Sequence, residues 1–261
     1  MQAALEKLGR LTLVFLEGLG RIGLLFREVM GSVLRGRIRW DQTVRQMEFV
    51  GIRSLPVVLL TGAFSGMVMA VQMYFQLKKV GMETGTGPVV SVSMTREIGP
   101  VFAALMVAGR VGAAIAAELG TMKVTEQVDA LRSFAVHPVD FLVVPRFVAL
   151  VVTLPILTGA AMFIGIECGR VVAAGLMGID LANFDANMIK FTDAEDVIGG
   201  LIKAGCFAVF ISMISCYKGL NCSEGAEGVG RATTEAVVVS SITVLISNFF
   251  ITYLLSYLIP P

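Results

Sequence analysis

Long apolar runs separated by short polar stretches are the dominant pattern of this chain. Each run is long enough to cross a hydrocarbon core of about 30 Å as a helix, which takes roughly 20 residues. Most runs carry one charge or none, and only the second contains several, namely Arg96, Glu97 and Arg110. The pattern predicts five transmembrane helices, over residues 54–77, 88–117, 147–166, 197–217 and 236–259.

Composition places the chain in the same class. Hydrophobic residues make up 56% of the sequence and charged residues 16%, and the mean hydropathy is +0.80. These values are typical of an all-α polytopic membrane protein, with its transmembrane domain over residues 54–261. The formal net charge of only +1 argues against a nucleic-acid partner.

The region before the first span, residues 1–53, predicts an amphipathic helix on the membrane surface. Charged residues from Glu6 to Glu28 recur at steps of four and seven and leave Leu, Val, Ile and Phe on the opposite face. They also interrupt every apolar run too early for a span or a secretory signal. We expect this helix to lie in the cytoplasmic interface. A soluble helix packed on a partner protein would have the same pattern.

The distribution of basic residues predicts the orientation. Nine of the 21 Lys and Arg residues precede the first span, and six more lie in the other two loops on that side. The opposite loops hold four. Because cytoplasmic loops retain Lys and Arg, we expect the N-terminus inside and the C-terminus outside.

A few polar residues interrupt the predicted spans. A charge at mid-membrane costs about 2.5 to 3.5 kcal/mol even on a lenient scale. Counted from the cytoplasmic ends of their helices, Arg96, Lys203 and Asn248 all lie roughly 20 Å up, at about 1.5 Å per residue. The sequence therefore places them in one layer, toward the outer side of the bilayer.

Arg96 and Glu97 need different partners within this layer, because neighbours on a helix point about 100° apart. Lys203 is the candidate partner of Glu97. The layer could meet a phosphate-bearing ligand, or it could be a structural ion pair that fixes helix register, and both interpretations stay open. Gly99 and Pro100 follow at once and should kink the helix, and a break beside charges suits a cavity wall.

Two further patterns concern packing. Met67, Met69 and Met73 cluster with Gln72 and Tyr74 near the outer end of the first span, where adaptable methionines could accept flexible chains or could simply pack. Small residues recur at four-residue steps, which predicts close helix–helix seams. The first such row is Gly62, Gly66 and Ala70.

Residues 118–131, between the second and third spans, predict a cytoplasmic amphipathic helix that is too polar to cross a membrane. Glu118, Met122, Glu126 and Asp129 recur at steps of four, four and three and would share one face. Such a helix between spans suits contact with a soluble partner.

Several classes of chemistry lack their motifs in this sequence. There is no G-x-x-x-x-G-K-[ST] phosphate loop, no H-E-x-x-H and no G-x-S-x-G, and the sole histidine is His137. The four cysteines have no CxxC spacing, so no metal site and no disulfide framework are indicated. We expect no catalytic residues in this chain.

Four blocks of sequence resemble a known family. They are TREIGPV at 95–101, AGRVGA at 108–113, ELGTMKVTEQ at 118–127 with Ala130 and Leu131, and EGAEGVGRATTEAV at 224–237. They occur in the family's order and cover nearly the whole chain, so the sequence is similar to the MlaE (YrbE) permeases.

The resemblance implies a subunit of an ABC transporter in the bacterial inner membrane. Such permeases move phospholipid between that membrane and a periplasmic MCE-domain protein and so support outer-membrane lipid asymmetry. They form homodimers with two cytoplasmic ATPase subunits, which bind the ATP and Mg, a small STAS-domain protein, and a hexameric MCE ring. No cofactor is expected in this chain itself, and the C-terminus would be periplasmic.

The resemblance also suggests residue roles. Residues 118–131 become the coupling helix that seats in the ATPase, with contacts expected from Glu118, Met122, Glu126, Gln127, Asp129 and Leu131. An outward-open lipid cavity is expected to be walled by Met69, Gln72, Met73, Tyr74, Arg96, Glu97, Lys203 and Asn248. Several relatives carry aspartate where this chain has Asn248, so a role that needs a negative charge there is in doubt.

Two other functions remain open from the sequence. An ion-coupled secondary transporter could use Arg96, Glu97 and Lys203 as a relay, although five spans without an evident inverted repeat fit it poorly. A scaffold that only tethers partners would tolerate neutral residues at these positions. The substrate could also be a sterol or a solvent rather than a phospholipid.

Overall fold

A computed structural model describes the backbone of residues 2–36 and 38–258, and the side chains of Leu13 and of residues 16–36 and 38–257. Over that part of the chain every regular element is a helix. Five of the described stretches are long and apolar enough to cross a membrane: Trp40–Lys78, Glu83–Val124, Val139–Gly175, Ala194–Leu220 and Gly225–Tyr257. The chain is an all-α polytopic membrane protein, as predicted. The predicted end of the fifth span, residue 259, lies outside the described residues.

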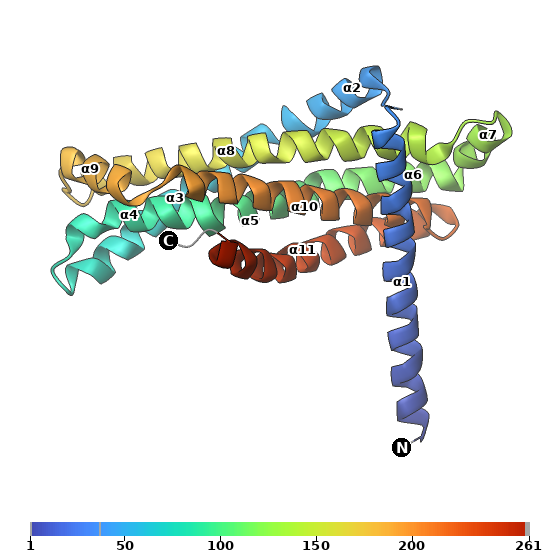
Figure 1. The fold of residues 1–261 in the computed structure, drawn as a ribbon, viewed down its shortest axis with the longest axis horizontal. Coiled ribbons are helices and arrows are strands. Elements are labelled where there is room, and N and C mark those ends of the chain that lie inside the picture. The colour runs from blue at the N-terminus through green and yellow to red at the C-terminus, as the bar shows by residue number, and fades with distance from the viewer. Residues whose placement is uncertain (1, 37, 259–261) are drawn as a thin grey trace.

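The predicted N-terminal region divides into two helices with different neighbours. Helix α1 (Gln2–Leu34) stands across the long axis of the bundle (Figure 1), which is the orientation expected of a helix lying in the membrane plane. Helix α2 (Trp40–Gly51) instead packs along α8, and only a turn at residues 52–54 separates it from α3 (Leu55–Lys78). The bundle therefore begins earlier than predicted. The side chains of Glu6 and Arg10 lie outside the described ones.

The other spans are longer than the apolar runs that predicted them. The second span is assembled from η1 (Glu83–Gly85), α4 (Thr86–Ser93), η2 (Met94–Ile98), α5 (Gly99–Val107), η3 (Ala108–Gly112) and α6 (Ala113–Val124). The short helix α7 (Gln127–Ser133) follows, and η4 (Val139–Val143) with α8 (Val144–Gly175) makes the third span. Helix α9 (Leu181–Phe191) connects it to α10 (Ala194–Leu220), and α11 (Gly225–Leu258) is the last.

Helices α3 and α8 touch backbone to backbone along the predicted glycine row. A Cβ atom added to Gly66 would lie 1.9 Å from the carbonyl oxygen of Gly165, and one added to Gly62 would lie 2.7 Å from that of Ala161. Side chains at these positions would force the helices apart, so the seam depends on glycine. Ala70 continues the row and is buried.

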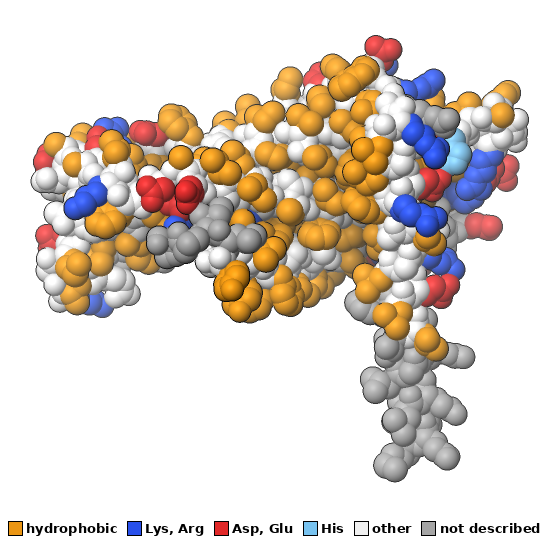
Figure 2. All heavy atoms as spheres, viewed as in Figure 1, with side chains coloured by type: hydrophobic (Ala, Val, Ile, Leu, Met, Phe, Trp, Pro, Cys, Tyr) orange, Lys and Arg blue, Asp and Glu red, His pale blue; other side chains and the backbone are white. Residues whose placement is uncertain are grey.

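The surface fits a bilayer environment. Hydrophobic side chains cover the flank of the bundle, while charged side chains gather mainly toward its two ends (Figure 2). On the part of α11 that the structure describes, large apolar residues are exposed, among them Leu245, Phe249 and Tyr253. Lipid or other protein must cover such surface in the membrane.

A salt bridge connects α9 to the C-terminal part of α8. Arg170 donates two hydrogen bonds to Asp185, Nε to Oδ1 at 2.6 Å and Nη2 to Oδ2 at 2.7 Å. The hydrogen bond and charge of Arg170 hold the pKa of Asp185 below its ordinary value. Phe184, beside it in sequence, is buried against Gly87 of α4. These contacts position α9 over α4.

Candidate functional site

The second span changes its helical geometry where its charged residues lie. Residues Met94–Ile98 form a π-helix, a rare form that often occurs at functional sites. Pro100 follows, and because proline has no backbone N–H, the carbonyl of Arg96 four residues earlier loses its usual helical donor. The ammonium group of Lys203 takes this place and donates to the Arg96 carbonyl oxygen at 2.7 Å. The backbone hydrogen bond that Pro100 removes is thus replaced by one from a residue of another span.

A glycine of α10 brings this helix close enough for the contact. A Cβ atom added to Gly200 would lie 2.2 Å from the carbonyl oxygen of Thr95 in the second span. A larger residue at this position would push α10 away from the π-helix. Lys203 lies within a turn of Gly200 and is therefore carried directly to the break.

Glu97 is the centre of a network that joins three spans. Its Oε1 accepts hydrogen bonds from Lys203 at 2.7 Å and from Thr252 at 3.0 Å, and its Oε2 accepts one from the Asn248 amide at 2.9 Å. The predicted pairing of Glu97 with Lys203 is confirmed, and so is the common layer with Asn248. Lys203 also donates to Thr252 at 2.8 Å, so its three ammonium protons are all engaged.

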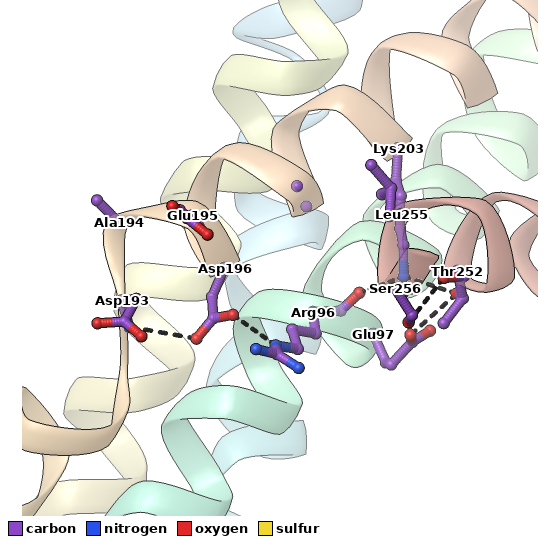
Figure 3. Close-up of a pocket in the computed structure, with 12 residues that line it drawn as sticks. Arg96, Glu97, Asp193, Ala194, Glu195, Asp196, Lys203, Thr252, Leu255 and Ser256 are labelled. Carbon is purple, nitrogen blue, oxygen red and sulfur yellow. Dashed lines mark hydrogen bonds and ion pairs between the residues drawn. The ribbon is translucent and has the colours of Figure 1, made fainter. Parts of the chain in front are cut away.

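Arg96 points away from Glu97, as expected for neighbours on a helix, and reaches Asp196 (Figure 3). Its Nε lies 2.5 Å from Asp196 Oδ1. The Asp196 side chain is 3% exposed, whereas that of Arg96 is 49% exposed. Among the described residues, no other hydrogen bond holds the terminal amino groups of Arg96. They are therefore available to a ligand.

Asp196 is one of the site residues that sequence reasoning missed, as are Thr252, Asp193 and Glu195. Asp196 lies one residue before the predicted fourth span and takes part in a capping box with Asp193 at the start of α10. The sequence feature that could have identified it is the D-x-x-D spacing of Asp193 and Asp196 ahead of an apolar run. It predicts a helix start, but not the contact with Arg96.

Arg96, Glu97, Lys203 and Asp196 line a cavity of about 490 Å³ between the second, fourth and fifth spans. Asn248, predicted to wall the same cavity, is not among its described lining residues. Its volume falls within the usual range of ligand pockets. Figure 3 shows Arg96 between the Asp193–Asp196 group on one side and the Glu97, Lys203 and Thr252 group on the other. Its lining is Arg96, Glu97, Asp193, Ala194, Glu195, Asp196, Gly199, Gly200, Lys203, Thr252, Leu255 and Ser256.

The residues predicted near the end of the first span do not line this cavity. Met69 and Gln72 line a second cavity of about 360 Å³, between α3 and the second span, together with Phe64 and Phe102. Met73 and Tyr74 are among the described lining residues of neither cavity. The Tyr74 ring is buried, and its hydroxyl accepts a hydrogen bond from Lys78 at 3.3 Å. Within one chain, the residues predicted to form a single lipid cavity therefore do not all line the same cavity.

The predicted continuous helix over residues 118–131 is wrong. Helix α6 ends at Val124, Glu126 adopts a left-handed backbone conformation with φ of 60°, and α7 begins at Gln127. Of the four residues predicted to share one face, Glu118 and Met122 thus belong to the end of the second span, Glu126 lies in the turn, and Asp129 lies on α7. No glycine or proline marks this break, so the periodicity alone could not reveal it.

Two of these residues already have partners within the chain. Glu118 pairs with Arg146 of α8 at 2.8 Å, and Asp129 pairs with Lys123 at 2.8 Å and Arg132 at 3.0 Å. The hydrogen bond from Lys123 is the main cause of a lowered pKa at Asp129. Glu126 and Gln127 are exposed at the corner, while Met122 and Leu131 pack partly against the core.

Comparison with known proteins agrees with this architecture. The MlaE permease family matches residues 43–254. A probable ABC transporter permease protein of Rickettsia conorii is 44% identical over 246 residues, which cover 94% of this chain and 95% of that one. The intermembrane phospholipid transport system permease protein MlaE of Haemophilus influenzae is 40% identical over 210 residues, 80% of each chain.

A plant protein is also similar. The chloroplastic protein TRIGALACTOSYLDIACYLGLYCEROL 1 of Arabidopsis thaliana is 37% identical over 221 residues, which cover 85% of this chain and 63% of that one. The family match spans all five transmembrane segments and includes the residues that form the Arg96 cavity up to Thr252. This chain belongs to the MlaE permease family.

Proposed function

We propose that this permease is the membrane subunit of an ABC transporter that moves phospholipid between the bacterial inner membrane and a periplasmic MCE-domain protein. The cavity around Arg96 carries the proposal. An arginine whose terminal amino groups are free presents a fork of donors that matches a phosphate group. A charged side chain within a span is costly, and such residues commonly mark a substrate path.

The surroundings of the cavity fit the two parts of a phospholipid. Arg96 would bind the headgroup phosphate, while the acyl chains would lie along the exposed apolar flank of α11. The second cavity, with Met69 and Gln72, is lined mainly by apolar atoms and suits an acyl chain. The name of the Haemophilus influenzae relative, an intermembrane phospholipid transport system permease, supports this substrate class.

The α6–α7 corner, residues 125–127, would transmit the movement of the ATPase to this chain. The corner exposes Glu126 and Gln127, so it offers polar contacts to a cytoplasmic ATPase. The partner ATPase, rather than this chain, would bind ATP and Mg, in line with the absence of a phosphate loop from the sequence. Closure of the ATPase would move this corner and narrow the cavity at the other end of the second span.

The assembly that we propose contains two copies of this chain, two ATPase subunits, a STAS-domain protein and a periplasmic MCE-domain hexamer. The exposed apolar residues of α11 are compatible with a contact between two copies. The basic residues of the cytoplasmic loops favour an inside N-terminus and a periplasmic C-terminus.

The test is transport by the reconstituted complex. Proteoliposomes containing the full chain and its partner subunits should transfer a labelled phospholipid to the MCE-domain protein only when ATP is hydrolysed. Arg96→Gln should reduce the phospholipid that co-purifies by about tenfold, since one charge-assisted contact is lost. Lys79→Gln, an exposed lysine outside the cavity, is the matched control.

Two results would contradict the proposal. Transfer driven by an ion gradient without ATP would favour a secondary transporter. Full transfer by the Arg96→Gln complex would remove the cavity from the transport path.

A further inference from the structure

The charges that line the Arg96 cavity do not balance. Two are positive, from Arg96 and Lys203, and four are negative, from Glu97, Asp193, Glu195 and Asp196. The two cations are each matched by one carboxylate, Lys203 by Glu97 and Arg96 by Asp196. The carboxylates of Asp193 and Glu195 are left without a matching positive charge in the lining. Both are exposed at the cavity, and among the described residues neither has a basic partner.

Of the two cations, only Arg96 can receive a ligand. Lys203 is buried and spends its three protons on Glu97, Thr252 and the Arg96 carbonyl. Arg96 is half exposed and is held through Nε alone, so its terminal amino groups face the cavity. A bound phosphate would therefore sit on Arg96, in a cavity that the uncompensated carboxylates at the start of α10 also line (Figure 3).

Helix capping alone does not require this charge. Asp193 is the N-cap of α10, but a cap needs a side-chain oxygen, and asparagine supplies one equally well. The N-terminus of α10 contributes roughly half a positive charge, which does not offset two full carboxylates. Glu195 takes no part in the capping box. Both side chains thus leave a negative field at the cavity rim.

We propose that the cavity selects phospholipids whose headgroup carries a cation beyond the phosphate over phospholipids whose headgroup is anionic overall. The phosphate would bind Arg96, and the ammonium group, a short carbon link away, would lie near Asp193 and Glu195. This rests on the proposed phospholipid function and names the headgroup class for the same site. An anionic headgroup would meet Arg96 equally well but would face repulsion from the two carboxylates.

The test is competition between two lipids. The full chain with its partner subunits is equilibrated with vesicles of equal phosphatidylethanolamine and phosphatidylglycerol with identical acyl chains, then repurified, and its bound lipids are quantified by mass spectrometry. Two exposed charge contacts predict about a three- to tenfold excess of phosphatidylethanolamine. The double variant Asp193→Asn, Glu195→Gln should bring the ratio close to one while total bound lipid is retained.

Controls keep the outcomes separate. Glu83→Gln removes an exposed carboxylate on the same side of the protein and outside the cavity, and it should leave the ratio unchanged. Glu195→Gln alone keeps the capping box intact and should shift the ratio partway, so the test survives a folding defect of the double variant. Equal binding of both lipids by the unaltered protein would overturn this inference alone. If the unaltered protein bound neither of the two lipids, the proposed function itself would be overturned.

Discussion

Lys203 donates a hydrogen bond to the backbone carbonyl of Arg96, a group on a different span, at 2.7 Å. The carbonyl lacks a backbone donor because the residue four positions later is a proline. The cost of burying the lysine charge in the membrane is offset by its pairing with Glu97. One side chain thus satisfies a break in the backbone and a buried charge together. The network is therefore a structural element as well as a wall of the cavity.

Lys203→Met should destabilise the protein by about 2 to 3 kcal/mol, because it leaves the Glu97 carboxylate and the Arg96 carbonyl without their strongest donor. Thermal unfolding of the purified protein in detergent measures the loss. Adding Glu97→Gln should restore part of it, since the unpaired charge is then gone. An unaltered melting temperature for Lys203→Met would show that the network adds no stability.

Gly66→Ala should separate α3 from α8, because the added Cβ would lie 1.9 Å from a backbone oxygen that cannot move alone. We expect the free energy of unfolding to fall by about 3 kcal/mol. The fraction of protein that stays monodisperse after heating would then fall at a lower temperature than for the unaltered protein. Gly205→Ala is the matched control, since a Cβ there meets nothing within 4 Å. The seam would be less tight than described if both variants melted alike.

Glu126→Lys should uncouple ATP hydrolysis from lipid transfer, because it reverses an exposed charge at the corner proposed to seat in the ATPase. Transfer per ATP hydrolysed should fall about tenfold while the complex still assembles. Asp129→Lys is a less clean change, since Asp129 also holds Lys123 and Arg132. Glu48→Lys reverses another exposed charge, on α2, and serves as the control. Unchanged coupling in Glu126→Lys would move the docking site elsewhere.

The contact between Arg170 and Asp185 should make the order of α9 depend on pH. Because the pKa of Asp185 is lowered in the folded protein, its carboxylate stabilises α9 above the ordinary value of about 4. This stabilisation is lost as the pH falls from there through the lower folded value. Hydrogen exchange of α9, corrected for intrinsic rates, should therefore rise in acid.

Asp185→Asn should remove this pH dependence and give fast exchange in α9 at neutral pH as well. Asp180→Asn, one residue before α9 and without a described ion pair, should behave like the unaltered protein. If the Asp185 variant kept the same acid transition, another group would have to cause it.

The polar layer was predictable because a membrane interior leaves charged groups few alternatives. Arg96, Glu97, Lys203 and Asn248 are costly in lipid, so partners for them had to exist at a similar depth, and helix rise alone gave that depth. The five spans followed from the same physics. Their ends did not, since capping and polar residues extend each helix past its apolar run.

Other parts of the site depend on tertiary contacts that periodicity does not encode. Asp196 was not predicted because only the approach of α10 to the π-helix, allowed by Gly200, brings it to Arg96. Met69 and Gln72 share an end of the bundle with the polar layer but face another cavity, since depth does not specify which side of a helix faces which neighbour. The left-handed Glu126 likewise has no local sequence signal.

The direct backbone contact of α3 with α8 determines which parts of the bundle can shift during a transport cycle. Two helices whose backbones are in direct contact cannot move closer together or slide easily, so they behave as one rigid unit. The Arg96 cavity is bounded on one side by α11, which at this level is linked to the second and fourth spans by hydrogen bonds of Asn248 and Thr252. Any separation of α11 from the second and fourth spans at this level must therefore break the hydrogen bonds of these two side chains.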